Sequence, residues 1–178
     1  MLDLGSGGGL DVLLSARRVG PDGIAYGLDA SRDMLTLAHA NAKKAQITNA
    51  RFLHGHIEDI PLPDDHVDVV ISNCVINLSG DKARVLAEAF RVLMPGGRLG
   101  ISDVRADEGV DAAELSRAEQ QVGCVAGALT QQRYMDLLAG TGFAEIKIVS
   151  TDQAATGLHS AIIQARKPLV DRPQTLVR

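Results

Sequence analysis

Short apolar segments alternate along the chain with longer segments whose apolar residues recur at helical spacing. The apolar segments predict strands at Met1–Leu4, Ile24–Leu28, Arg51–His54, Val67–Ser72, Arg98–Ser102, Ala144–Val149 and Ser160–Arg166. The fourth of these contains an almost unbroken β-branched run, which is typical of a strand covered on both faces. The alternation of strands and helices predicts an α/β fold with a mostly parallel sheet and helices on both faces.

Two segments between the strands predict helices with recognisable ends. Ser31 is expected to cap a helix whose apolar positions are Met34, Leu37, Ala38, Ala42 and Ala45. Ser79 is expected to cap a second helix whose apolar stripe is Ala83, Leu86, Ala87, Phe90 and Leu93. The residues Pro95-Gly96-Gly97 are expected to end that helix, because proline cannot continue the helical turn and glycine tolerates positive φ.

The segment 104–129 does not continue the alternation of strands and helices. Ala112, Leu115, Ala118 and Val122 indicate a loose helix, and small residues follow it. A connection of this length inside one domain is usually functional. We therefore expect a lid-like insertion at 104–129 within a single domain spanning residues 1–167, followed by a poorly ordered tail at 168–178.

Composition narrows the classes of function. Hydrophobic residues make up 46% of the 178 residues, but no apolar run approaches the roughly 20 residues needed to span a membrane. The formal net charge of −4 argues against a nucleic-acid partner, which would require a basic surface. The two cysteines form no disulfide framework, and this favours a reducing cytoplasm. No metal site is predicted, because the histidines are scattered without ligand spacing, at His39, His54, His56, His66 and His159.

The clearest chemical signal is a glycine loop that directly follows the first predicted strand. Gly5-Ser6-Gly7-Gly8-Gly9 has the spacing G-x-G-x-G, and Asp3 lies two residues before it. A dinucleotide fingerprint requires a glycine at the sixth place, where this chain has Leu10. The pattern instead resembles the S-adenosylmethionine loop of class I methyltransferases, which leaves a nicotinamide dehydrogenase as a distant alternative.

This resemblance implies a Rossmann-like class I methyltransferase fold with an antiparallel last strand, and S-adenosyl-L-methionine as the cofactor. Asp29 closes the second predicted strand, where an acid accepts hydrogen bonds from ribose hydroxyls. Ile57 and Glu58 match the pair that contacts adenine in the family, although Glu58 could instead be a solvated loop charge. The implied cofactor-binding residues are Asp3, Gly5, Ser6, Gly7, Gly9, Asp29, Met34, Ile57, Glu58 and Asn73.

The sequences around the two cysteines are more specific. Ser72-Asn73-Cys74-Val75-Ile76-Asn77-Leu78-Ser79 follows the fourth strand, at the edge of the sheet where a transferable methyl group would lie. This string and Val122-Gly123-Cys124-Val125-Ala126-Gly127-Ala128-Leu129 closely resemble arsenite methyltransferases. The resemblance implies that Cys74 and Cys124 hold trivalent arsenic and that Asn73 shapes the wall facing the methyl group. Simple packing is the alternative for either thiol.

The residue types suit this chemistry. Arsenic(III) is soft and selects thiolate ligands, as soft metals do. Its lone pair carries no proton, so it can attack the sulfonium methyl group without a general base. The resemblance further implies arsenite or its thiol conjugate as a small-molecule substrate, a role in arsenic detoxification, and a thiol reductant as co-substrate, either glutathione or thioredoxin.

The chain also differs from the family that it resembles. That family has an N-terminal segment before the glycine loop and often a C-terminal extension, so we expect this sequence to be an N-terminally truncated form. Two other functions stay open at this point. One is methyl transfer to a small organic acceptor, with Cys74 only packing, and the other is a non-catalytic remnant that binds the cofactor.

Overall fold

The computed structural model describes residues 1–110, 125 and 127–169. Within these residues the chain forms a seven-stranded sheet in the order β3-β2-β1-β4-β5-β7-β6. The strands are β1 (Leu2–Leu4), β2 (Ala25–Asp29), β3 (Ala50–His54), β4 (Val67–Asn73), β5 (Leu93–Ala106), β6 (Ala144–Ala155) and β7 (Leu158–Arg166). Strands β1 to β5 pair in parallel, whereas β7 pairs antiparallel with β5 and β6. The predicted Rossmann-like sheet with an antiparallel last strand is confirmed.

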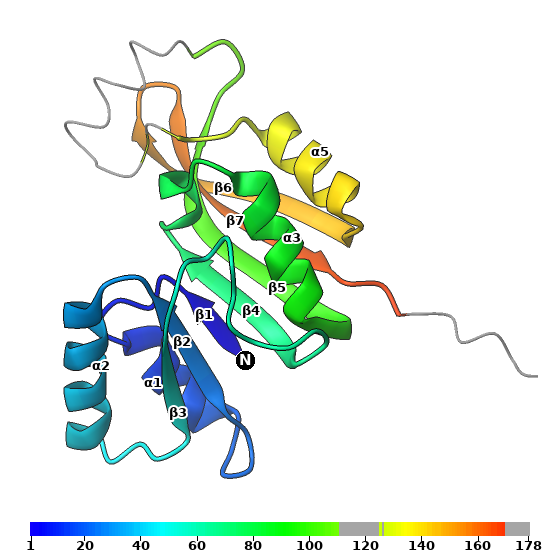
Figure 1. Cartoon of the computed structure of the whole chain (residues 1–178). Helices are drawn as coiled ribbons and strands as arrows, with labels where there is room; N and C mark the ends of the chain where they lie inside the picture. The colour runs from blue at the N-terminus through cyan, green and yellow to red at the C-terminus, as the bar shows by residue number, and fades with distance from the viewer. Residues whose placement is uncertain (111–124, 126, 170–178) are drawn as a thin grey trace, which may run out of the picture.

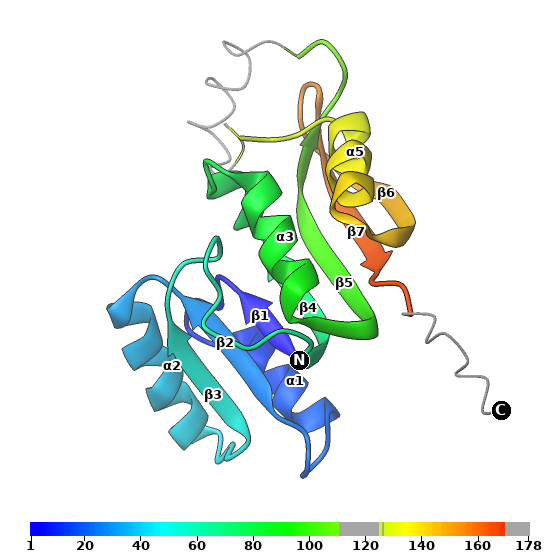
Figure 2. The same cartoon turned by 45° about the vertical axis from the view of Figure 1, so that its right-hand side comes forward.

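Helices cover both faces of the sheet, as predicted (Figure 1). The helices α1 (Leu10–Arg18) and α2 (Arg32–Lys44) pack over β1, β2 and β3, around a small core that contains Val12 and Ala16. On the other face, α3 (Lys82–Val92) and α5 (Gln131–Thr141) lie side by side over the main core (Figure 2). None of these helices is long and apolar enough to cross a membrane.

The beginning of α2 agrees with the sequence prediction, but its buried face is narrower. The hydroxyl of Ser31 accepts a hydrogen bond from the Met34 N–H at 3.3 Å, which is the expected N-cap. The side chains of Met34 and Leu37 are 40% and 47% exposed, so their predicted place in the apolar stripe is wrong. The buried residues of α2 are Leu35, Ala38 and Ala42.

Both ends of α3 differ from the prediction. Its N-cap is Asp81, whose carboxylate accepts a hydrogen bond from the Arg84 N–H at 2.9 Å, and not Ser79. The helix ends at Val92, so Leu93 is not part of its stripe. Its buried face carries Val85, Leu86, Ala89 and Val92, whereas the expected stripe positions Ala83 and Ala87 are exposed.

Strand β5 is much longer than its predicted range of 98–102. It begins at Leu93, which pairs with Val67 of β4, and passes through the residues that were expected only to end the helix. It continues to Ala106, so the predicted lid-like insertion does not begin at residue 104. Most of that insertion, residues 111–124 and 126, lies outside the described residues.

Strand β4 is not covered equally on its two faces. Val67 and Val70 are buried, but Val69 and Ile71 are only half-buried. The reason is that α1 packs on β1, β2 and β3, and Ile71 lies in a shallow hollow beside it. The predicted coverage of this strand on both faces is therefore only partly correct.

Candidate functional site

The loop between β1 and α1 requires its glycines. Three of them have left-handed backbone, with φ of +71° at Gly5, +50° at Gly7 and +83° at Gly9. A Cβ atom at Gly5 would lie 2.5 Å from the Val75 side chain, in the turn that follows β4. The N–H groups of Gly5 and Ser6 both donate to the Leu28 carbonyl, at 2.8 and 3.0 Å. The glycine loop is thus held between β2 and the turn after β4.

Asp29, at the end of β2, joins this loop to the start of α2. One carboxylate oxygen accepts a hydrogen bond from the Gly7 N–H at 2.8 Å, and the other accepts from the Ser31 N–H at 2.8 Å. A carboxylate has further lone pairs for additional donors. Asp29 is therefore fixed in orientation and can still accept hydrogen bonds from a bound hydroxyl group.

Two polar groups near the glycine loop are buried. Asp3 is 3% exposed, and its burial, followed by the charges of Asp11 and Asp29, raises its pKa to about 7. The Ser6 hydroxyl is also buried and has no hydrogen-bond partner within the described part of the chain. The Ser6 hydroxyl packs against Gly27 of β2, where an added Cβ atom would lie 2.7 Å from it.

A cavity of about 460 Å³ lies beside the loop, at the carboxyl ends of the parallel strands. Its lining residues are Gly5, Asp29, Ala30, Ser31, Gly55, His56, Ile57, Glu58, Asn73, Cys74, Val75, Leu78 and Ser79. Six predicted site residues thus meet at one cavity: Gly5, Asp29, Ile57, Glu58, Asn73 and Cys74. Asp3, Ser6, Gly7, Gly9 and Met34 do not line it. Cys124 lies outside the described residues.

Cys74 has an unusual backbone conformation at the wall of this cavity. Its φ is +53°, a left-handed value that residues other than glycine rarely adopt and that costs about 1–3 kcal/mol. The Cys74 N–H donates to the Ser102 carbonyl of β5 at 2.9 Å. Strain of this kind often marks functional sites. Cys74 directly follows the last residue of β4, and its exposed side chain belongs to the cavity wall.

Glu58 joins two loops across the cavity. Its carboxylate accepts a hydrogen bond from the Ser79 hydroxyl at 2.5 Å, and its backbone carbonyl accepts from Arg84 Nε at 3.0 Å. The Ser79 hydroxyl also accepts from the Asp81 N–H at 3.1 Å. Glu58 is therefore bound within the protein and is not simply a solvated charge.

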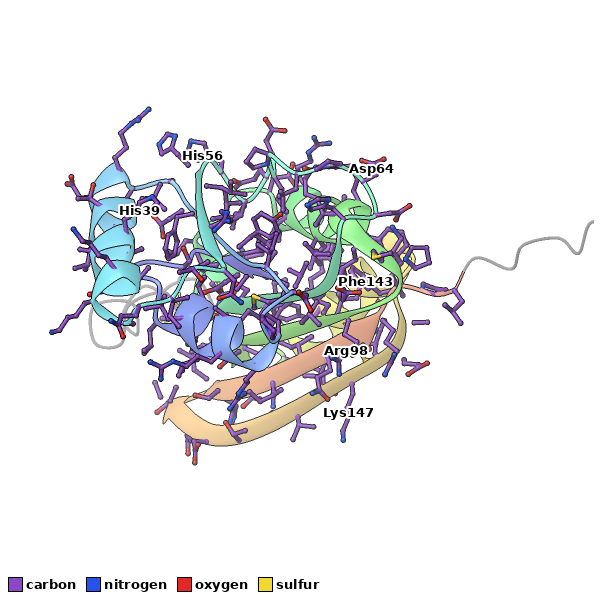
Figure 3. All side chains as sticks on the ribbon, turned by 90° about the horizontal axis from the view of Figure 1, so that it is seen from below. His39, His56, Asp64, Arg98, Phe143 and Lys147 are labelled. Atoms are coloured by element: carbon purple, nitrogen blue, oxygen red, sulfur yellow. The ribbon has the colours of Figure 1, made fainter. Side chains whose placement is uncertain are left out.

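Sequence reasoning missed several residues of the cavity. Ser79 was expected only to cap a helix, and Leu78 and His56 were assigned no role at the site. His56 is exposed at the outer rim of the molecule, on the loop that follows β3 (Figure 3). The available signal was position, because His56 precedes Ile57, and Leu78 and Ser79 end the string that contains Cys74.

The residues that follow Cys124 pack close to the same region. Val125 is fully buried, in a cluster with Val104, Ala106 and Leu158. A Cβ atom at Gly127 would lie 2.1 Å from the backbone carbonyl oxygen of Asn77. Gly127 therefore packs directly against the short helix η1 (Ile76–Leu78), which follows Cys74.

Comparisons with known proteins agree with this geometry. A family model described as a methyltransferase domain matches residues 1–167. The chain is 39% identical to an arsenite methyltransferase of Halobacterium salinarum, covering 96% of this chain and 47% of that protein. It is 41% identical to an arsenite methyltransferase of Aquipseudomonas alcaligenes, covering 92% of this chain and 49% of that protein.

The fold is similar to the crystal structure of an arsenic(III) S-adenosylmethionine methyltransferase from Chlamydomonas reinhardtii. The TM-score is 0.78 at 32% identity, and the match covers 97% of this chain and 64% of that one. The chain spans about half the length of the curated relatives it matches. The range matched by the family model contains every residue that lines the cavity.

Proposed function

Because the chain belongs to the methyltransferase domain family, we propose that it transfers a methyl group from S-adenosylmethionine to trivalent arsenic. The similarity to arsenite methyltransferases supports this choice of substrate. The observation that carries the proposal is the Cys74 side chain in the wall of the cavity that begins at the glycine loop. Such a thiol is a soft ligand beside the place of methyl transfer.

The residues of the cavity fit S-adenosylmethionine, which would supply an electrophilic methyl group on a sulfonium. Gly5 lets the backbone pass where a side chain would collide with Val75. In the proposal, Asp29 accepts hydrogen bonds from the ribose hydroxyls, Ile57 packs on the adenine ring and Glu58 accepts from the adenine amino group. The remaining predicted contacts, Asp3, Ser6, Gly7, Gly9 and Met34, do not line the cavity, and the first four are proposed to act by supporting the loop.

In the proposed reaction, the Cys74 thiolate binds arsenic(III) and directs its lone pair toward the methyl carbon. An arsenic–carbon bond forms while the sulfonium sulfur–carbon bond breaks, and the electrons of that bond stay on sulfur. No proton is removed from the acceptor, so the step requires no general base. Asn73 is proposed to shape the wall beside the methyl group, and Cys124 is proposed as the second thiolate on the strength of the sequence resemblance.

The methyl transfer consumes the arsenic lone pair, so the product is pentavalent. We propose that a thiol reductant, glutathione or thioredoxin, returns the arsenic to the trivalent state as two of its thiols are oxidised to a disulfide. A further reduced thiol supplies a sulfur ligand. The cytoplasmic location and the lid-like role of the segment after β5 stay predictions from the sequence.

Calorimetric titration of the reduced protein tests the proposal. Arsenite should bind to the unchanged protein, and Cys74→Ser and Cys124→Ser should each weaken binding on the order of tenfold or more, because a hydroxyl is a poor ligand for a soft centre. Binding of S-adenosylhomocysteine should stay unchanged in both variants and so controls for folding.

The other outcomes distinguish the alternatives. Arsenite binding that is indifferent to both substitutions would support an organic acceptor, with Cys74 only packing. Binding of S-adenosylmethionine by this chain, without methylation of any arsenical, would support a non-catalytic remnant.

A further inference from the structure

A buried carboxylate–amide pair lies behind the turn that carries Cys74. Asp103 of β5 is 2% exposed and Asn77 of η1 is 4% exposed. The Asn77 side-chain amide donates to one Asp103 oxygen at 2.8 Å and to the Val104 carbonyl at 2.7 Å. The Asn77 backbone N–H donates to the other Asp103 oxygen at 3.3 Å. One carboxylate therefore holds both the backbone and the side chain of Asn77.

Hydrogen bonds attach the turn to β5 at Ser102 and at the adjoining residues Asp103 and Val104. The first is the hydrogen bond from the Cys74 N–H to the Ser102 carbonyl. The second, from Asn77 to Asp103, follows at the next residue of the strand. Because β5 is paired on both sides, with β4 and β7, it is a rigid support for the turn (Figure 2). A strained residue such as Cys74 keeps its conformation only when surrounding contacts hold it.

The groups that face Asp103 keep its carboxylate ionised near neutral pH. Burial raises the pKa of Asp103 to about 6, against the opposing effects of the Val104 and Asn77 N–H groups and the positive charge of Lys82 on α3. From α5, Tyr134 is fully buried, and its pKa is raised by burial and then by the charges of Asp103 and Cys74. An ionised carboxylate is the stronger hydrogen-bond acceptor for the two N–H donors of Asn77.

We propose that Asp103 is a positioning residue that, through Asn77, holds the turn presenting Cys74 to the cavity. Its importance for arsenic chemistry rests on the proposed function, but the positioning itself does not. Asp103 does not line the cavity, so its effect on a ligand is indirect. The sequence alone indicated no role for either residue.

The substitution Asp103→Asn tests this role with little change in volume. One side-chain oxygen remains and can still accept from Val104 and from the Asn77 amide. The other oxygen becomes an NH₂ group, which faces the Asn77 N–H as a second donor. Asp107→Asn is the matched control, because the Asp107 carboxylate pairs with the side chains of Arg105 and His159 and not with the turn.

Hydrogen–deuterium exchange of the full chain gives a readout that requires no ligand. Near pH 7.5, Asp103→Asn should raise the exchange of a peptide covering residues 74–79 on the order of tenfold, because a buried hydrogen bond to a charged group is lost. The control should not change this peptide, and neither variant should change the peptide covering the glycine loop. An opening that exposes Asp103 to water returns its raised pKa toward 3.8 and releases its proton, so opening is favoured at higher pH. In the wild-type protein, exchange of 74–79, corrected for intrinsic rates, should therefore fall between about pH 7 and pH 5, and in Asp103→Asn it should not.

Arsenite titration adds the functional readout. Asp103→Asn should weaken arsenite binding several-fold and leave S-adenosylhomocysteine binding unchanged. If Asp103→Asn does not fold, Asn77→Ala gives the same readouts, since it removes the side-chain bonds and keeps the Asp103 charge. Unchanged exchange of 74–79, or an equal rise in both peptides, would overturn the positioning role. Faster exchange of 74–79 alone, in a protein that binds no arsenite, would support the positioning role of Asp103 and contradict the proposed function.

Discussion

Replacing Asp3 with asparagine is expected to stabilise the protein increasingly as the pH rises. Asp3 is 3% exposed, and burial together with the charges of Asp11 and Asp29 raises its pKa from 3.8 to about 7. In the unfolded chain the carboxyl group has its ordinary pKa. The folded protein therefore retains a proton between about pH 4 and pH 7 that the unfolded chain releases, and the free energy of unfolding falls as the pH rises through this window.

The size of the effect follows from the pKa difference. At 1.36 kcal/mol for each pKa unit, a rise from 3.8 to about 7 corresponds to a penalty of roughly 4 kcal/mol when Asp3 is ionised in both states. Roughly 3 kcal/mol of this penalty develops between pH 5 and pH 8. Asparagine has a similar volume and no charge, so the Asp3→Asn variant should not show this pH dependence.

Urea unfolding followed by circular dichroism, between about pH 5 and pH 8, measures this difference, since the chain has no tryptophan for fluorescence. The exposed Asp22 provides the control for the loss of one carboxylate, through Asp22→Asn. A stability difference for Asp3→Asn that stays constant over this range would refute the reasoning. It would mean that Asp3 does not change its protonation on folding.

Three further outcomes are expected. Gly127→Ala should lower the free energy of unfolding by about 2 kcal/mol or more, because the new Cβ atom would collide with the Asn77 carbonyl. Gly140 of α5 has open space around it, so Gly140→Ala should raise the free energy of unfolding by about 1 kcal/mol. Equal effects of the two substitutions in urea unfolding would contradict this. Ser79→Ala should lower the free energy of unfolding, measured in urea, by about 1.5–3 kcal/mol, because the hydrogen bond to the Glu58 carboxylate is lost. Unchanged stability would mean that this hydrogen bond does not stabilise the fold. Arsenite binding should strengthen as the pH rises toward about 8.5, and a flat calorimetric profile would contradict binding by ordinary thiols.

Local signals in the sequence were sufficient for most of the fold. The β-branched run at 67–71 and the Ser31 cap each depend on residues close together in the chain. The residues at which helices and strands begin and end were harder to predict. Leu93 continues a helical pattern but belongs to β5, because it pairs with Val67, twenty-six positions earlier. Such pairing between distant segments has no signature in a local pattern.

The sequence by itself determined that four of the predicted site residues meet at the cavity. Gly5, Asp29, Glu58 and Cys74 follow or end successive strands, and a parallel sheet brings those ends to one edge. Only the tertiary structure decided what each group contacts, as for the bond between Ser79 and Glu58. Periodicity and spacing report on neighbours along the chain. Burial and hydrogen bonding, which set the pKa values and hold the Cys74 turn, depend on groups that only folding brings together.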